Sequence, residues 1–159
     1  PFETDAIVTS IPASKGTPAY GTISTENGFS FAYDMDDNDV VYGLGESNRG
    51  INKRGYVYES NCSDQPNHTE DKISLYGAHN FIVISGKQTF GLFVDYPGKL
   101  KFDIGYTLSS QIKITCEDAD LYLYVIEGET PYDIVKQFRK IIGRSYCCKQ
   151  MHDCKSFRI

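Results

Sequence analysis

Short apolar segments bounded by turn residues follow one another along most of this chain. In 99–105 and 111–117 apolar and polar residues alternate, as they do in strands with one buried face. The chain also carries twelve Tyr and nine Phe, which favour strands over helices. The complete series of predicted strands is 20–24, 28–33, 39–45, 54–60, 80–85, 88–96, 99–105, 111–117 and 120–128. Such a succession predicts an antiparallel β-sandwich.

Two short connections predict hairpins between neighbouring strands. Glu26-Asn27-Gly28 suits a tight turn because Asn and Gly tolerate positive φ. Ser85-Gly86-Lys87 joins the strands at 80–85 and 88–96 in the same way. The last strand is apolar at nearly every position, which predicts that both of its faces are covered.

One C-terminal segment has the periodicity of an amphipathic helix. Thr130 can cap its start, Pro131 suits the first helical position, and Asp133 completes a variant capping box. Gly143 fits the left-handed position after the end. The apolar residues at helical spacing are Ile134, Val135, Phe138, Ile141 and Ile142.

The predicted organisation is therefore one mainly all-β domain. Residues 1–19 read as an irregular lead-in, 20–128 as the β-sandwich and 129–146 as the helical segment. Residues 147–159 show no strand or helix periodicity and are expected to be disordered. At 159 residues the chain can bury the core of one ordinary domain.

Net charge and the lengths of the apolar runs argue against two classes of partner. The formal charge is −5 and the isoelectric point is about 5.1, so no basic stripe meets nucleic-acid phosphates. No apolar run approaches the roughly 18 residues that a membrane-spanning helix requires. We expect neither a nucleic acid nor a membrane as a partner.

The five cysteines are odd in number and irregularly spaced, which favours a reducing compartment. We expect a bacterial cytoplasmic protein, although the chain begins at Pro1 and a removed signal peptide stays open. The glycosylation patterns at Asn61 and Asn67 matter only for a protein secreted from a eukaryotic cell.

The glycine-rich stretch 39–50, "DVVYGLGESNRG", resembles a nucleotide-binding loop at first sight. A dinucleotide fingerprint needs a third glycine where Asn48 stands. A phosphate loop needs Lys at Ile51 and Ser or Thr at Asn52. The glycines are instead predicted to let a strand bend or bulge close to another backbone. Glu46 and Arg49 are expected to pair or cap locally.

Two further stretches imitate metal sites. The acidic run 34–39 has calcium-loop spacing, but Asp39 replaces the turn glycine and Gly45 the bidentate Glu, so a solvated hairpin connection is expected. A closed zinc site normally splits its ligands between two separated pairs. The possible soft ligands of the tail are instead crowded together: Cys147, Cys148, His152 and Cys154. We expect no metal and no cofactor.

The polar stretch 60–81 is too long for a simple turn, and such loops are usually functional or disordered. Carboxylates and amides could bind sugar hydroxyls here, although a merely solvated loop is the alternative. His79 is expected to be a structural histidine, and no Ser-His-Asp or Cys-His arrangement is defensible from spacing. The polar candidates are Asp64, Gln65, His68, Glu70 and Asp71.

Five motifs in sequence carry a resemblance to a known family. They are "VYGLGES" (41–47), an Asp in a polar loop (Asp64), "LYGAHNFIV" (75–83), "TFGLFVDYPGKLKFDIGY" (89–106) and "LYVIEGETPYDIVKQFRKIIGR" (123–144). From about Tyr20 to Tyr146 the chain resembles the N-terminal β-sandwich of glycoside hydrolase family 31, the α-glucosidases and α-xylosidases. Within that family it most closely resembles α-glucosidases of gut Firmicutes.

The resemblance implies a sandwich of galactose-mutarotase-like type that packs against a (β/α)₈ barrel. In that family two barrel aspartates carry the chemistry with retention at the anomeric carbon, so no catalytic residue is expected in this chain. The family's sandwich loop reaches over the barrel mouth, and its Asp touches sugar. Asp64 occupies that place, and Gln65 and His68 are weaker candidates. After Tyr146 the sequence departs from the family, which suggests truncation.

We therefore expect a non-catalytic domain of a retaining α-glucosidase that removes terminal α-linked glucose from oligosaccharides. Without the barrel it is expected to be inactive, with a mobile loop. An exposed apolar patch is expected on the helix and last strand, where the barrel would sit and where self-association is possible. The alternatives are a stand-alone carbohydrate-binding sandwich, which would need its own aromatic platform, and a purely structural brace for the barrel.

Overall fold

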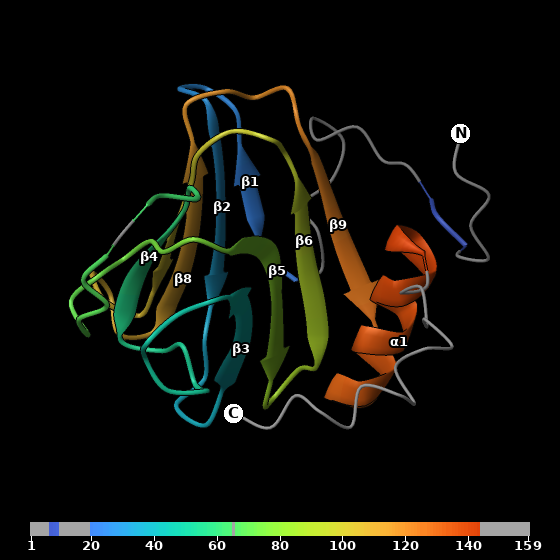
Figure 1. The fold of residues 1–159 in the computed structure, drawn as a ribbon. Coiled ribbons are helices and arrows are strands. Elements are labelled where there is room, and N and C mark those ends of the chain that lie inside the picture. The colour runs from blue at the N-terminus through green and yellow to red at the C-terminus, as the bar shows by residue number, and fades with distance from the viewer. Residues whose placement is uncertain (1–6, 10–19, 65, 144–159) are drawn as a thin grey trace, which may run out of the picture.

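The computed structural model describes residues 7–9, 20–64 and 66–143 and shows two antiparallel sheets with one helix (Figure 1). Each predicted strand is present, within a few residues of its expected bounds. The labelled elements are β1 (Thr22–Ser24), β2 (Phe29–Asp34), β3 (Val40–Gly45), β4 (Tyr56–Ser60), β5 (Ala78–Ser85), β6 (Phe90–Asp95), β7 (Leu100–Ile104), β8 (Gln111–Cys116), β9 (Tyr122–Glu127) and α1 (Pro131–Ile142).

The strands form a five-stranded sheet in the order β1-β2-β8-β7-β4 and a four-stranded sheet in the order β3-β5-β6-β9. Every pairing between these strands is antiparallel. Both predicted hairpins form: β1 pairs with β2, where Gly28 has a φ of 82°, and β5 pairs with β6. The predicted mainly all-β sandwich with one C-terminal helix is confirmed.

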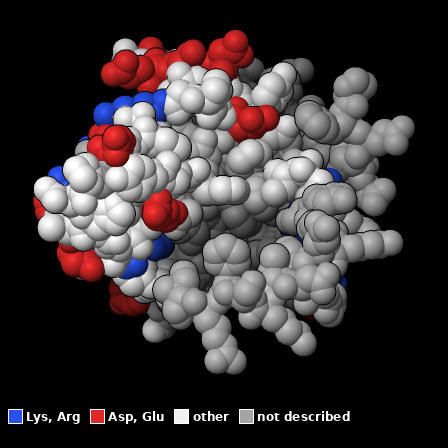
Figure 2. Space-filling model, in the orientation of Figure 1, with Lys and Arg blue, Asp and Glu red and all other residues white. Residues whose placement is uncertain are grey.

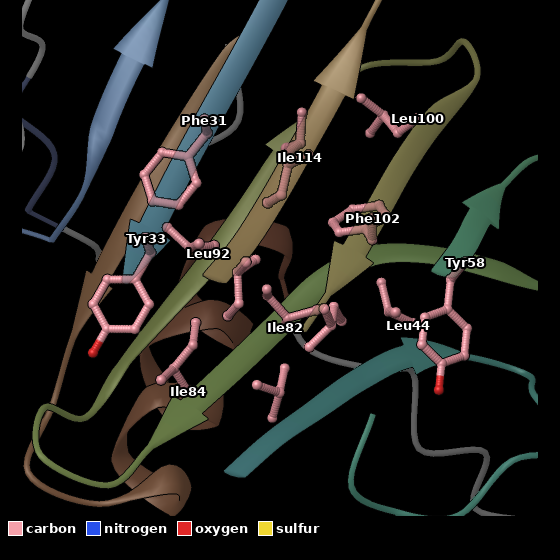
Figure 3. Close-up of a cluster of buried hydrophobic side chains, with 14 of the residues drawn as sticks. Phe31, Tyr33, Leu44, Tyr58, Ile82, Ile84, Leu92, Leu100, Phe102 and Ile114 are labelled. Carbon is pink, nitrogen blue, oxygen red and sulfur yellow. The ribbon is translucent and has the colours of Figure 1, made fainter. Parts of the chain in front are cut away.

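The main core lies between the two sheets (Figure 3). Alternation along β2 and β8 directs every second side chain inward. Ile114 of β8 lies opposite Phe31 of β2 on one side and Phe102 of β7 on the other. Ile82 and Leu92 come from the opposite sheet. All five are at most 1% exposed, and burying each such side chain contributes about 1.5–3 kcal/mol.

The four-stranded sheet is also covered on its other face, by α1 (Figure 1). The hydroxyl of Thr130 accepts a hydrogen bond from the Asp133 amide at 3.2 Å and donates one to the Asp133 carboxylate at 2.6 Å. The predicted start of the helix is therefore confirmed. Gly143 has a φ of 89°, but its ψ of 173° is extended. The predicted left-handed C-terminal geometry is wrong, because ψ does not follow from the glycine alone.

Three of the five apolar helix residues pack against the sheet: Ile134, Phe138 and, partly buried, Ile141. Ile134 and Phe138 are buried, and the Phe138 ring stacks on Phe81 with centroids 3.9 Å apart. A Cβ on Gly91 would overlap Ile134, so the glycine in β6 makes room for the helix. Val135 and Ile142 are exposed, as expected for a helix that carries an exposed apolar patch.

Both faces of β9 are partly covered, as predicted. Leu123 and Val125 pack against the main core, whereas Tyr124 and Ile126 pack against the cluster under α1. Since β9 is the edge strand of its sheet, only Ile126 is fully buried along it.

The acidic connection between β2 and β3 is only partly solvated. Asp39 is 2% exposed, and its carboxylate accepts hydrogen bonds from the amides of Asp36 (3.0 Å) and Lys87 (2.9 Å) and from the Tyr33 hydroxyl (3.2 Å). Burial and the neighbouring carboxylates raise the pKa of Tyr33 to about 12, so it stays a donor. The prediction of a merely solvated connection is wrong at Asp39. Its buried carboxylate links the β2–β3 connection to the β5–β6 connection.

The glycines of β3 shape its backbone, as predicted. Gly43 has a φ of 124°, and a Cβ there would overlap the carbonyl oxygen of Phe81 and lie 2.9 Å from the Ile82 Cα. The register to β5 then shifts between Gly43 and Gly45, and Leu44 between them has a φ of 67°. This β-bulge ends the strand and turns the chain toward the loop that precedes β5.

Replacing Gly43 by Ala is expected to lower the free energy of unfolding by about 3 kcal/mol or more, because a strained φ and a backbone overlap add together. Gly50→Ala is the matched control, since a Cβ at Gly50 meets nothing within 4 Å, and it should stay within about 0.5 kcal/mol of the parent. Urea unfolding of the two variants measures both values. Equal stabilities would contradict the role given to Gly43.

Candidate functional site

The longest connection between labelled strands is loop 61–77, which runs from β4 to β5. It extends beyond the edge of the sandwich beside β4, at the left of Figure 1. Acidic and basic side chains are interspersed over that side of the surface, whereas acidic groups gather at the upper end of the view (Figure 2). The loop therefore presents mixed polar chemistry and no broad patch of one charge.

The structure exposes the described candidate residues of this loop to solvent. Asp64 and His68 are both exposed, and the His68 ring lies edge-on to Tyr76 with centroids 5.3 Å apart. Glu70 and Asp71 are exposed as well, whereas Gln65 lies outside the described residues. The hydrogen bonds and ring contacts of the described residues do not join Asp64 to His68, so the two are separate groups on one loop.

The two arms of the loop are held against each other. The Glu59 amide donates to the carbonyl of Ile73 at 2.8 Å, and the Ser63 amide donates to the carbonyl of Leu75 at 2.9 Å. Leu75 is 3% exposed and anchors the returning arm in the protein. These contacts fix the arms on either side of Asp64, and the mobility of the loop as a whole stays a prediction.

Residues 46–49, called here the bracing turn, contact the loop at its middle and its end. A carboxylate oxygen of Glu46 accepts a hydrogen bond from the Gly77 amide at 2.8 Å. The Asn48 side chain donates weakly to the carbonyl of Thr69 at 3.5 Å. The bulge in β3 places this turn beside the loop, so the glycine-rich stretch supports the candidate site from outside the loop.

Arg49 makes the most extensive contacts of the bracing turn. Its Nε donates to the carbonyl of Glu70 at 3.0 Å, its Nη1 to that of Val57 at 2.8 Å and its Nη2 to that of Asp71 at 3.4 Å. The expected pairing with Glu46 is absent among the described ion pairs. Arg49 instead caps backbone carbonyls that are distant in sequence, which the local motif could not indicate.

Two tyrosines of β4 lie beneath the Arg49 guanidinium. Its carbon is 4.4 Å from the centroid of Tyr56 and 5.1 Å from that of Tyr58. Burial raises the pKa of Tyr58, and the charge of Arg49 opposes that effect. Burial, with Arg49 close by, also lowers the pKa of Lys53. In the sequence, this cluster is indicated only by two Tyr residues at alternate positions, Tyr56 and Tyr58, and by Arg49 a few residues before them.

Two hollows among the described residues are lined by polar groups. A cavity of about 20 Å³ lies between the bracing turn, β4 and the returning arm of the loop, which is room for one water molecule and not for a sugar. A groove of about 350 Å³ lies over β7 and β8. Its lining residues are Lys101, Asp103, Thr107, Leu108, Gln111, Lys113 and Thr115. No aromatic ring lines this groove, so it lacks the platform that a stand-alone sugar-binding module needs.

The described part of the chain offers little other site chemistry. It has no group of three or more His, Cys, Asp or Glu residues that could hold a metal ion, and none of its helices is long and apolar enough to cross a membrane. His79 is exposed at the start of β5 with its ring edge-on to Phe138. The cysteine-rich tail at 147–154 lies outside the described residues.

Known sequences resemble this chain over most of its length. Alpha-glucosidase 2 of Bacillus thermoamyloliquefaciens is 30% identical over 112 residues, which are 69% of this chain and 14% of the relative. An alpha-xylosidase of Emericella nidulans is 25% identical over 125 residues, which are 78% of this chain and 15% of the relative. The chain thus spans about one-seventh of the length of these relatives.

Solved structures share the fold. A cycloalternan-degrading enzyme from Trueperella pyogenes, in complex with isomaltose, matches with a TM-score of 0.69 at 20% identity over 79% of this chain and 19% of that one. A dextranase from Flavobacterium johnsoniae matches with a TM-score of 0.66 at 24% identity over 74% of this chain and 14% of that one.

The family assignment comes from residues 12–103, well over half of the chain. They match the family described as the glycosyl hydrolase 31 N-terminal galactose mutarotase-like domain. The match agrees with the two-sheet sandwich. It also agrees with the small fraction of each relative's length, about one-seventh, that this chain covers. The chain therefore belongs to the family of glycosyl hydrolase 31 N-terminal galactose mutarotase-like domains.

Proposed function

We propose that the chain is the non-catalytic N-terminal domain of a retaining α-glucosidase that removes terminal α-linked glucose from oligosaccharides. In this proposal loop 61–77 lines part of the substrate pocket, and the catalytic carboxylates belong to the remainder of the enzyme. The family membership and the relative named alpha-glucosidase 2 support the proposal. The observation that carries it is an exposed Asp64 on a loop whose arms are braced.

Asp64 has the chemistry for recognising a sugar. An ionised carboxylate only accepts hydrogen bonds, and its two oxygens can accept from two hydroxyls at once. Adjacent hydroxyls of a sugar ring are oriented differently in different epimers, so such a contact also selects among them. Because Asp64 is exposed, its carboxylate is available to a ligand that approaches from outside the sandwich.

An α-xylosidase is the second candidate, because two of the relatives carry that name. Xylose lacks the hydroxymethyl group of glucose, so the two activities differ in the space and polarity around that one substituent. A contact between Asp64 and ring hydroxyls would serve either sugar. Turnover of nitrophenyl α-glucoside against nitrophenyl α-xyloside by the full-length enzyme separates these two activities.

The outer face of α1 supplies a surface for the remainder of the enzyme. Tyr132, Val135 and Ile142 are spaced to lie on one side of the helix, and they are 69%, 41% and 52% exposed. Tyr122 on β9 is also exposed, at 70%. Large apolar side chains exposed together on one side of a helix commonly mark an interface. We propose that the catalytic barrel covers this face and that its exposure promotes self-association of the isolated domain.

The isolated domain is expected neither to hydrolyse nitrophenyl α-glucoside nor to bind maltose tightly. The cavity beside the bracing turn is too small for a sugar, and no aromatic ring lines the groove over β7 and β8. Activity assays and titration calorimetry on the pure chain test both points. Turnover would overturn the proposal, and micromolar binding of maltose would favour the stand-alone carbohydrate-binding module.

In the full-length enzyme, Asp64→Asn is expected to lower kcat/KM for an α-glucoside by about 10- to 100-fold, because hydrogen bonds to a charged group contribute roughly 1.5–3 kcal/mol each. Asp37→Asn is the matched control, since Asp37 is an exposed carboxylate on the β2–β3 connection. Steady-state kinetics of both variants give the comparison. Unchanged kcat/KM in the Asp64 variant would remove that residue from the substrate pocket.

A further inference from the structure

Arg49 joins β4, the strand that leads into loop 61–77, to the returning part of that loop. Its Nη1 holds the carbonyl of Val57, which precedes the loop on β4. Its Nε holds the carbonyl of Glu70, and Nη2 reaches that of Asp71, on the returning arm. The guanidinium is a planar fork with fixed donor directions, so these bonds hold the returning arm at a set distance from β4, the strand that leads to Asp64.

The surroundings of Arg49 keep this fork in place. The ring of Tyr58 is 4% exposed and lies under the guanidinium together with Tyr56. Aromatic faces attract cations in this geometry. In addition, the described ion pairs give Arg49 no carboxylate partner, so its donors are directed at backbone carbonyls, which do not move with a side-chain rotamer.

We propose that Arg49 is a positioning residue that holds loop 61–77 in the conformation that presents Asp64 to the substrate. This inference rests on the proposed role of Asp64 at the sugar. Three of the five N–H groups of Arg49 donate to backbone carbonyls of β4 and of the loop, so in this proposal the residue acts on the substrate through the loop. This proposal gives the glycine-rich stretch a function. The β3 bulge positions Arg49, and Arg49 holds the conformation of loop 61–77.

A lysine is not an adequate replacement for this arginine. A single ammonium group is a compact point charge on a flexible stem and lacks the planar fork. Arg49→Lys should therefore keep one carbonyl contact and lose the bridge between Val57 and Glu70. Arg49→Met removes all three hydrogen bonds while retaining an apolar stem that can cover Tyr58. The two variants together separate loss of charge from loss of the bridge.

Amide hydrogen exchange on the chain itself is the first test. In Arg49→Met and Arg49→Lys, the amides of Ser63 and Lys72, which bond to Leu75 and Thr69, should exchange at least about tenfold faster. Amides paired between β2 and β8 should be unchanged. Arg139→Met, an exposed arginine on α1, is the matched control. Unchanged loop exchange, or an equal increase throughout β2 and β8, would overturn the inference.

Kinetics of the full-length enzyme are the second test. Arg49→Met should raise KM for an α-glucoside about tenfold with a smaller change in kcat, and it should have no further effect in an Asp64→Asn background. Additive effects of the two substitutions would overturn the inference. If Asp64→Asn alone leaves KM unchanged, the proposed function of the loop fails, whereas the exchange result still decides whether Arg49 holds the loop.

Discussion

The close approach of β3 and β5 at Gly43 is the constraint on which the arrangement of the candidate site depends. The two backbones are so near that a single methyl group at Gly43 would overlap Phe81. The register shift and the positive φ of Leu44 follow directly after it. Together they end the strand and bring the bracing turn against loop 61–77. A backbone contact inside one sheet thus determines where a polar loop outside the sandwich lies.

The four-stranded sheet separates two different tasks. Its inner face contributes Ile82 and Leu92 to the main core, which stabilises the sandwich. Its outer face receives α1 through Ile134 and Phe138, with Gly91 providing the space. The helix is thereby fixed with its opposite side exposed. The same sheet therefore supports the loop through β3 and β5 and carries α1, with its exposed apolar side chains, through β6 and β9.

The local elements could be predicted from sequence, because alternation, helical spacing and a Thr-Pro-x-Asp cap depend on neighbouring residues. The glycine bulge was also predictable, since the nucleotide alternatives failed at Asn48 and Ile51. The roles of Asp39 and Arg49 were not predictable. Asp39 bonds to the Lys87 amide and Arg49 to the carbonyls of Glu70 and Asp71, and these partners meet only after the sheets assemble. The composition of a motif gives no information on such distant contacts.

The most direct measurement is a crystal structure of the full-length enzyme with an α-linked glucose disaccharide bound. The account predicts an Asp64 carboxylate oxygen about 2.6–3.2 Å from a sugar hydroxyl, on a loop that Arg49 ties to β4 through the carbonyls of Glu70 and Val57. A sugar bound with Asp64 directed into solvent, or a loop in the predicted place with Arg49 detached from it, would contradict the account.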